Sequence, residues 1–271
     1  MDNYSFRNFG RIKLSTMEKV SLITCYIGRS NYIKRILACF LAQDYEGPIE
    51  LILYHNGYGI HQLSKDIILP PNKTIKLINN HLDSETGKEY TNTGAIFRDA
   101  LKQTSGEIIN FFDSDDLFLP NHVSEGAKGL EKALKIGCWA YKPKKSYHVY
   151  LDKFTLEANN MEPSIFVAKH YLELMGFAKV SSSYHQQWLS PLQHSTRIYE
   201  DEIGTPTFLY DWHRGHNTFK ISGSGDDSEK NFRSHRIFES SLSEEHILTP
   251  LTREELNKEY EGITNSGLCH K

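Results

Sequence analysis

Short apolar runs alternate with helix-like stretches over the first half of the chain, and this alternation restricts the fold more than any other feature. The apolar, strand-like runs occupy residues 20–26, 49–54, 75–79 and 108–112. Apolar residues recur at helical spacing over 33–41, and a second helix is expected over 93–104. This order favours an α/β fold with a mostly parallel sheet, right-handed crossovers and a ligand beyond the carboxyl ends of the strands.

Composition favours an ordinary soluble domain. The 271 residues are 39% hydrophobic, enough for one large core or one core with a small appendage. With 31 basic and 34 acidic residues, the net charge of -3 gives no global attraction to nucleic acid or anionic lipid. No apolar run approaches the roughly 18 to 20 residues that cross a bilayer, and the first residues lack the apolar centre of a signal peptide. We therefore expect a cytoplasmic protein without a transmembrane segment.

Three carboxylates crowd the end of the fourth apolar run, where Asp113, Asp115 and Asp116 follow Phe112. A strand that ends in this way projects its acids from one edge of a sheet. Hard divalent cations prefer carboxylate oxygens, and such a cation keeps positions open for a diphosphate. The sequence thus predicts a metal site here, with an acidic turn after a buried strand as the simpler alternative.

Two common nucleotide-binding motifs are missing from the expected positions. The first strand is followed by YIGRS at residues 26–30 rather than by the GxGxxG that dinucleotide-binding oxidoreductases need, and there is no P-loop. The loops at 26–31, 55–58 and 113–116 are nevertheless expected to share one crevice, because they follow parallel strands of one sheet. A nucleotide site of another class is therefore expected.

Residues 20–57 (VSLITCYIGRSNYIKRILACFLAQDYEGPIELILYHNG) and 92–123 (NTGAIFRDALKQTSGEIINFFDSDDLFLPNHV) resemble the nucleotide-diphosphosugar domain of family-2 glycosyltransferases. The resemblance implies the Rossmann-like GT-A fold, a mixed, mostly parallel sheet flanked by helices, here with a C-terminal appendage of helix and loop. It also implies transfer of a sugar, with inversion, from a nucleoside diphosphate to a hydroxyl. UDP-sugar is the expected donor, and Mn2+ or Mg2+ the expected cofactor.

The resemblance assigns roles to individual residues. It implies nucleotide-sugar contacts by Thr24, Cys25, Tyr26, Asn56, Arg98, Asp113, Asp115, Asp116 and Arg214. Asn56 stands where the family often has a base-reading carboxylate, and an amide still pairs with a pyrimidine edge. Asp113 and Asp115 form the DxD motif that holds ribose and metal, with Asp116 as the supporting acid. Arg98 supplies a cation near the phosphates, shifted by one position from the family pattern.

The catalytic base is expected in the second half, which departs from the family. Residues 161–177 resemble the acceptor-side strand and helix, but the Glu-Asp pair that normally follows is replaced by YHQQW at 184–188. An inverting transfer needs a base within reach of the acceptor hydroxyl. His185, whose imidazole suits proton transfer near neutral pH, and Asp201 are equal alternatives.

Residues 208–218 (FLYDWHRGHNT) resemble the closing strand and loop of the family. In several such enzymes a histidine from this segment completes the metal shell opposite the DxD motif. His213 and His216 are the implied ligands, because a neutral imidazole binds manganese as well as zinc. Packing, or phosphate contact by Arg214, is the alternative for this segment.

We expect three parts in the chain. They are an N-terminal extension (1–19), a GT-A domain (20–222) with a nucleotide-sugar half (20–120) and an acceptor half (121–222), and a C-terminal lid and helical tail (223–271). Two other functions stay open, a nucleotidyltransferase and a catalytically inactive nucleotide-sugar-binding module. The acceptor is a glycan, a lipid-linked glycan, a protein or modified nucleic acid, and the sequence does not choose among them.

Overall fold

The structure is a computed structural model that describes residues 18–27, 30–150, 153–180, 183–201, 204–212 and 247–265. Within these residues the largest element is a seven-stranded sheet in the order β11-β7-β10-β5-β1-β2-β4. Its strands are β1 (Val20–Tyr26), β2 (Ile49–His55), β4 (Lys73–Asn79), β5 (Ile108–Phe111), β7 (Ala140–Pro143), β10 (Phe166–Ala168) and β11 (Ile198–Asp201). The four strands predicted in the first half are all present.

The strands run mostly parallel, as expected. β1 pairs in parallel with β2 and β5, β2 with β4, and β7 with β11. β10 is antiparallel to both of its neighbours, β5 and β7. All strands except β10 therefore point the same way, and their carboxyl ends lie at one edge of the sheet, where α/β folds bind ligands.

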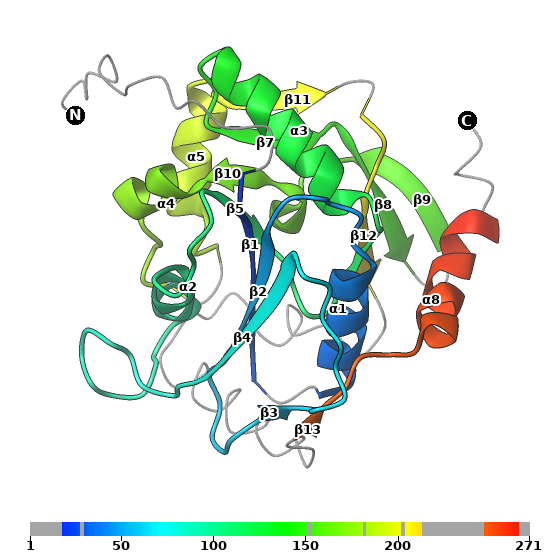
Figure 1. Cartoon of the computed structure of the whole chain (residues 1–271). Helices are drawn as coiled ribbons and strands as arrows, with labels where there is room; N and C mark the ends of the chain where they lie inside the picture. Colours follow the sequence, from blue (N-terminus) through cyan, green and yellow to red (C-terminus); the bar gives the residue numbers. More distant parts are fainter. Residues whose placement is uncertain are drawn as a thin grey trace.

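Helices cover both faces of this sheet (Figure 1). One face packs against α1 (Ser30–Ala42) and α3 (His122–Lys135), and α8 (Arg253–Asn265) packs on α1. The other packs against α2 (Thr93–Leu101), α4 (Lys169–Met175) and α5 (Gln186–His194). Because both faces are buried there, β1, β2 and β5 read as nearly continuous apolar runs, whereas the edge strand β4 alternates. Among the helices of the described residues, we find none with the length and apolar character to cross a membrane.

Two smaller sheets complete the described fold. One has the order β6-β12-β8-β9, and the other pairs β13 with β3. Their strands are β3 (Gln62–Leu63), β6 (Leu117–Phe118), β8 (Lys145–Tyr150), β9 (Lys153–Ala158), β12 (Phe208–Trp212) and β13 (Ile247–Leu248). β6 begins directly after the acidic tetrapeptide and pairs with β12, so the second sheet meets the main sheet at the predicted site.

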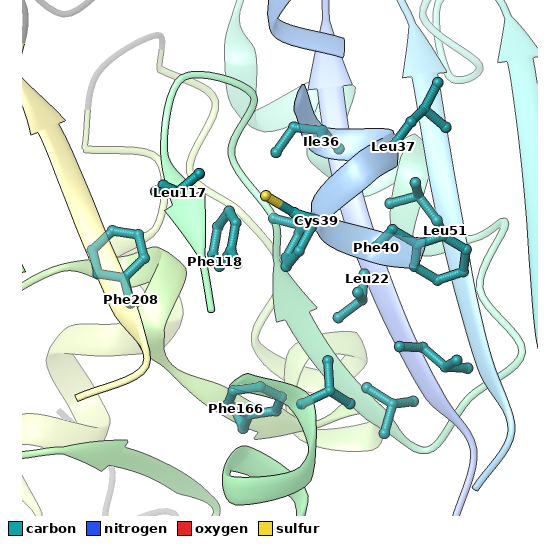
Figure 2. Packing of buried hydrophobic residues seen from close by; sticks show 14 of the residues in the cluster. Leu22, Ile36, Leu37, Cys39, Phe40, Leu51, Leu117, Phe118, Phe166 and Phe208 are labelled. Atoms are coloured by element: carbon teal, nitrogen blue, oxygen red, sulfur yellow. The ribbon is translucent and has the colours of Figure 1, made fainter. Parts of the chain in front are cut away.

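The core fixes both ends of the tetrapeptide. Phe112, directly before it, stacks on Phe118 with ring centroids 3.7 Å apart. Phe118 in turn lies 5.4 Å from Phe208 of β12, and Figure 2 shows these two rings beside Leu117 in the cluster under α1. Burying a phenylalanine stabilises a fold by about 1.5 to 3 kcal/mol. The acidic loop is therefore held between two well-packed anchors.

Element ends differ slightly from the predicted ones. β4 begins at Lys73, two residues before the apolar run, because the Lys73 ammonium is buried and donates to the carbonyls of Phe40, Leu41 and Gln43. In the sequence, a buried lysine whose ammonium is fully hydrogen-bonded looks the same as an exposed one. The helix expected to reach Thr104 ends at Leu101. Of the predicted lid and tail (223–271), residues 223–246 and 266–271 lie outside the described residues.

Candidate active site

The three aspartates after β5 form an acidic loop (113–116) at the carboxyl edge of the main sheet. Phe112 donates its N–H to the carbonyl of Ile23 at 2.8 Å, and Thr24 Oγ1 donates to the carbonyl of Phe112 at 2.5 Å. These bonds start the loop level with the end of β1. Within it, Asp116 is buried and Asp115 is half-buried.

Negative charge is concentrated in this loop. Burial, and then the charges of Glu162 and Asp115, raise the pKa of Asp113 well above its ordinary value. Burial, followed by the charges of Asp115 and Asp113, does the same to the pKa of Asp116. A carboxylate among like charges is stabilised by a bound cation. The loop therefore has the charge excess of a cation site.

Arg35 and Asp211 hold the acidic loop from the side of α1 and β12. Arg35 donates from Nη1 to Asp211 Oδ2 at 2.7 Å and from Nη2 to the carbonyl of Asp115 at 2.5 Å. The backbone N–H of Asp211 donates to Asp116 Oδ1 at 3.3 Å. The sequence analysis selected neither Arg35 nor Asp211, because a single arginine in an apolar helix does not reveal its partners.

A fourth carboxylate, Glu162, lies next to the loop and was also missed. It begins the 3-10 helix η2 (Glu162–Ser164), just before β10. Asn110 of β5 donates from Nδ2 to the carbonyls of Pro163 at 2.8 Å and Ile165 at 3.1 Å. Because Asn110 precedes Asp113 by three residues on the same strand end, these bonds bring Glu162 within electrostatic range of Asp113.

His185 joins the site through Glu162. Its Nδ1 lies 2.5 Å from Glu162 Oε2. His185 stands at the start of α5, where its carbonyl accepts from the N–H groups of Trp188 and Leu189. The Trp188 ring stacks on Phe111, the last residue of β5, with centroids 5.6 Å apart. This packing holds the first turn of α5 against the end of β5.

Tyr184 packs beside His185 at the start of α5. Its ring stacks on Phe97 of α2 at 4.5 Å and meets His185 edge-on at 5.4 Å. Burial, followed by the charges of Glu162 and Asp113, raises the pKa of Tyr184. Gly94 permits this contact between α2 and the segment before α5, because a Cβ there would lie 1.8 Å from the carbonyl oxygen of Ala178.

Asp201, the other alternative for the base, is placed elsewhere. It ends the edge strand β11, which is separated from β5 by β7 and β10. Three strand spacings of about 4.8 Å put β11 about 14 Å from β5. Asp201 Oδ2 lies 3.7 Å from the ammonium of Lys132 on α3. The structure thus brings His185, and not Asp201, to the acidic loop.

The residues expected around the nucleotide lie at the ends of β1 and β2, beside the loop. Thr24, Tyr26 and Asn56 are buried, whereas Cys25 is half-buried. The N–H of Asn56 donates to the carbonyl of Tyr26 at 3.0 Å, which joins the two strand ends. Burial, followed by the charge of Asp113, raises the pKa of Cys25. Among these four residues, Cys25 is therefore the one whose pKa is affected by a charge of the acidic loop.

A ring cluster that the sequence analysis did not foresee supports this corner. His55 and His61 stack with centroids 3.8 Å apart, and Tyr26 OH lies 3.1 Å from His61 Nδ1. Asn79 of β4 completes the cluster, with its Oδ1 3.1 Å from His55 Nδ1 and 2.9 Å from the N–H of His61. Three buried rings therefore fix the loop after β2.

Arg98, expected to supply a cation near the phosphates, lies among carboxylates of its own chain. Its guanidinium is bound by three carboxylates, Asp83 at 2.5 Å, Glu85 at 2.7 Å and Asp99 at 3.0 Å. Asp99 also accepts from Tyr90 OH at 2.8 Å. Arg98 therefore ties the loop after β4 to α2, and sequence spacing could not distinguish this use from a phosphate contact.

The remaining predicted residues, His213, Arg214 and His216, lie outside the described residues, which end on this strand at Trp212. In the described part of the chain no group of three or more His, Cys, Asp or Glu side chains is arranged to hold a metal. The donor chemistry nevertheless fits a divalent cation, because the carboxylates of the acidic loop repel one another. In addition, Glu162 Oε1 is buried without a hydrogen-bond partner among the described residues.

No family model matches the sequence, and no curated protein does. Among solved structures, S. aureus TarS 1-349 in complex with UDP-GlcNAc aligns with a TM-score of 0.53 and 14% identity, covering 93% of this chain and 73% of that one. Its complex with UDP gives 0.51 and 14%, covering 89% and 69%. A longer TarS chain is matched over 37% of its length.

A second enzyme aligns over a similar part of the chain. Glucosyl-3-phosphoglycerate synthase from Mycobacterium tuberculosis, in complex with phosphoglyceric acid, gives a TM-score of 0.51 and 10% identity over 84% of this chain and 81% of that one. Its complex with Mn2+, UDP and glucosyl-3-phosphoglycerate gives 0.50 and 12% over the same shares. Identities this low show a shared architecture. The chain therefore has the GT-A fold expected from its sequence, which it shares with these two proteins.

Proposed function

We propose that this protein is a metal-dependent glycosyltransferase that moves a sugar from UDP to a hydroxyl acceptor with inversion at the anomeric carbon. The observation that carries the proposal is the acidic loop, whose repelling carboxylates stand at the carboxyl edge of a GT-A sheet. The ligands of the aligned structures support it, since TarS binds UDP-GlcNAc and the mycobacterial synthase binds Mn2+ and UDP. The fold alone leaves donor and acceptor open.

Asp113 and Asp115 are the proposed metal-holding residues. Asp113 also contacts the ribose, and His213 or His216 adds an imidazole ligand. When bound, a Mn2+ or Mg2+ ion neutralises negative charge on the leaving diphosphate. Asp116 keeps the loop in place through the backbone of Asp211. That contact supports a role for the histidines, because the chain reaches His213 two residues after Asp211.

Nucleoside recognition is proposed at the ends of β1 and β2. Cys25 borders the ribose and diphosphate, and the Asn56 amide offers a donor and an acceptor to a pyrimidine edge. The hydroxyls of Thr24 and Tyr26 bond Phe112 and His61. These two residues therefore support the pocket wall and do not bind the nucleotide through their hydroxyls. Arg214 is left as the proposed diphosphate cation, since Arg98 is neutralised by its own carboxylates.

The proposed base is His185, the alternative that lies beside the acidic loop. It takes the proton of the acceptor hydroxyl as the hydroxyl oxygen attacks the anomeric carbon. General base catalysis of this kind contributes about 100- to 10,000-fold in rate. Asp201 is not needed in this scheme, because it stands at the far edge of the sheet beside Lys132.

Titration calorimetry with UDP, in the presence and absence of MnCl2, tests the nucleotide and metal sites together. We expect UDP to bind with Mn2+ and to bind much more weakly in EDTA. Release of UDP from UDP-glucose, UDP-galactose and UDP-GlcNAc then measures the chemistry with water as acceptor. Indifference to UDP and Mn2+ together would contradict the proposal.

Two other outcomes identify the alternative functions. Binding of UDP-sugars without any release of UDP, with every acceptor tried, would favour a nucleotide-sugar-binding module. Stronger thermal stabilisation by UTP than by UDP, with two metal ions bound per chain, would favour a nucleotidyltransferase. Each result replaces the proposed activity with a defined alternative.

A further inference from the structure

The buried contact between Glu162 and His185 is not accounted for by nucleotide or metal binding. Glu162 Oε2 lies 2.5 Å from His185 Nδ1, and the two side chains are 9% and 18% exposed. The two residues come from different elements, η2 and the start of α5. A contact of this kind between two separately anchored residues is a defined feature of the fold rather than a surface ion pair.

We propose that Glu162 is a positioning residue that orients His185 for removal of the acceptor proton, an inference that rests on the glycosyltransferase function proposed above. A Glu-Asp pair usually stands at this point of the resembling enzymes, and its Asp serves as the base. Here the sequence has Tyr184 and His185 instead. A carboxylate can act as a base in either orientation, whereas an imidazole needs the correct tautomer and ring orientation.

Both partners are held independently of each other. Two hydrogen bonds from Asn110 fix the backbone around Glu162, and Ile165 donates its N–H to the Glu162 carbonyl at 2.9 Å. His185 is fixed by the first turn of α5 and by the edge of the Tyr184 ring. The backbone positions of both residues are therefore set by separate contacts, which keeps the two side chains together.

The contact determines which ring nitrogen is basic. In a neutral imidazole one nitrogen carries the proton and the other carries the lone pair. Glu162 Oε2 lies 2.5 Å from the buried Nδ1, although the ring orientation does not meet hydrogen-bond geometry. A small turn of the ring that lets Nδ1–H donate to Glu162 would leave the lone pair on Nε2. Nε2 is therefore the nitrogen that can accept a proton from a substrate.

The proton and electron balance of the step follows from this arrangement. The acceptor O–H proton moves to His185 Nε2, and the oxygen forms a bond to the anomeric carbon. The bond from that carbon to the diphosphate oxygen breaks, and its electron pair leaves with UDP. The imidazolium that forms is balanced by the adjacent Glu162 carboxylate, as in a carboxylate-histidine pair. Solvent later removes the proton and restores the neutral ring.

The position of the pair relative to the acidic loop supports this role. Of the neighbouring charges, that of Glu162 raises the pKa of Asp113 most. The pair therefore lies near the residues proposed to hold the diphosphate. The reacting bond must lie between the metal-bound diphosphate and the base. Glu162 and His185 stand on the η2 and α5 side of the loop, opposite the Arg35 contact from α1.

A double-mutant cycle tests the pair. UDP release from the UDP-sugar that the wild-type protein hydrolyses is measured with MnCl2 for Glu162→Gln, His185→Ala and the double variant. We expect each single change to lower kcat by about 100-fold or more, the lower end of general base effects. The double variant should lose no more than His185→Ala does, because Glu162 acts through His185. UDP affinity, measured by calorimetry, should stay within about twofold of wild type, since the pair acts in the chemical step and not in ground-state binding.

His194→Ala is the matched control, because His194 is an exposed histidine at the other end of α5. It should leave kcat unchanged. If Glu162→Gln folds poorly, imidazole rescue gives a second measurement, because the ratio of UDP release with and without imidazole is taken within one protein sample and does not depend on its folded fraction. Added imidazole should restore UDP release in His185→Gly, and the restoration should be weaker when Glu162→Gln is also present.

Three results would contradict the proposed role of Glu162 in positioning His185. They are an unchanged kcat in Glu162→Gln, a double variant whose loss equals the product of the single losses, and equal imidazole rescue in both backgrounds. A wild-type protein that neither binds UDP with Mn2+ nor releases it from a UDP-sugar contradicts the glycosyltransferase function itself. Failure of the pair alone leaves wild-type binding and release intact, so the two failures are distinguishable.

Discussion

The acidic loop and the Glu162–His185 pair lie side by side at one edge of the sheet, yet they are built in opposite ways. The loop is one continuous tetrapeptide between two buried residues, Phe112 and Leu117. The pair joins two elements separated by more than twenty residues of chain. The loop contains carboxylates that repel one another, and the pair places a carboxylate against an imidazole. The comparison teaches that the loop gathers groups of like charge, whereas the pair sets a carboxylate against a group that can accept a proton.

The supports of the two regions differ as well. Arg35 crosses from α1 to fix the carbonyl of Asp115, so the loop depends on a buried charge. The pair depends on the neutral amide of Asn110 and on the stacking of Trp188 against Phe111. Substitutions can therefore disturb one region while leaving the other in place, and the following predictions use this separation.

The largest expected effect is on catalysis, in Asp115→Ala. If Asp115 holds the metal as proposed, its loss removes several kcal/mol of transition-state stabilisation. Since 1.4 kcal/mol corresponds to a tenfold change, UDP release should fall by about 1000-fold. Mn2+-dependent UDP binding, followed by calorimetry, should weaken in parallel. Asp66→Ala, at an exposed aspartate far along the chain from the loop, is the control and should behave as wild type.

The next effect is on stability, in Arg35→Ala. The change leaves the buried Asp211 carboxylate without its guanidinium partner, a loss that costs about 3 kcal/mol or more. Urea denaturation should show the corresponding drop in the free energy of unfolding. Arg253→Ala, at an exposed arginine that begins α8, should change it by less than about 0.5 kcal/mol. Equal losses in the two variants would show that Arg35 does not hold the loop.

A smaller effect separates the two regions directly. Asn110→Ala removes the donors to the carbonyls of Pro163 and Ile165, at a cost of about 2 kcal/mol in unfolding free energy. Because these bonds position Glu162, UDP release should also fall while UDP affinity is retained. Asn72→Ala is the matched control, since Asn72 also donates to two carbonyls, those of Tyr45 and Gly47. It should lower stability without a change in kcat, and the same kcat loss in both variants would contradict the role of Asn110.

The smallest expected effect is a pH dependence of stability in the acidic loop. The pKa of Asp113 is raised in the folded protein, so the folded state binds its proton more tightly than the unfolded state, whose carboxyl has a pKa of about 3.9. Unfolding free energy therefore falls as pH rises from that value through the folded pKa. Relative to wild type, Asp113→Asn should be more stable at pH 7 than at pH 5 in EDTA.

Urea denaturation at the two pH values checks this difference. Comparison of the two proteins at each pH removes the opposite contribution of His122, whose pKa burial lowers to about 3 and which destabilises both proteins as pH falls. Addition of MnCl2 at pH 7 should reduce the advantage of Asp113→Asn. A pH-independent difference between the two proteins would show that Asp113 carries no excess charge in the folded state.

Much of the fold was predictable, because its signals are local. Each predicted strand of the first half is a run of adjacent apolar residues, and both helices between them follow helical spacing. The hairpin of β8 and β9 was not foreseen, since residues such as Lys145, His148 and Lys153 interrupt its apolar pattern. Antiparallel pairing satisfies their backbone groups whatever the side chains.

The residues of the site divide in the same way, into those marked by sequence neighbours and those brought together only by the fold. Asp113, Asp115 and Asp116 were visible because they are neighbours in the chain at the end of a strand. Glu162 stood within the acceptor-side segment 161–177 but had no adjacent partner in the sequence to mark it. Arg98 was ambiguous because its sequence position is the same whether it binds phosphate or the carboxylates of Asp83 and Asp99.

By itself, therefore, the sequence determined the parallel sheet and the acidic loop at its edge, since both follow from residues in direct succession. The tertiary structure decided which distant groups meet there. Arg35 and Asp211 are 176 positions apart, and the Glu162–His185 contact depends on the packing of η2 and α5 against β5. The physical reason is that burial forces polar groups to find partners wherever the fold supplies them, and sequence spacing carries no record of that choice.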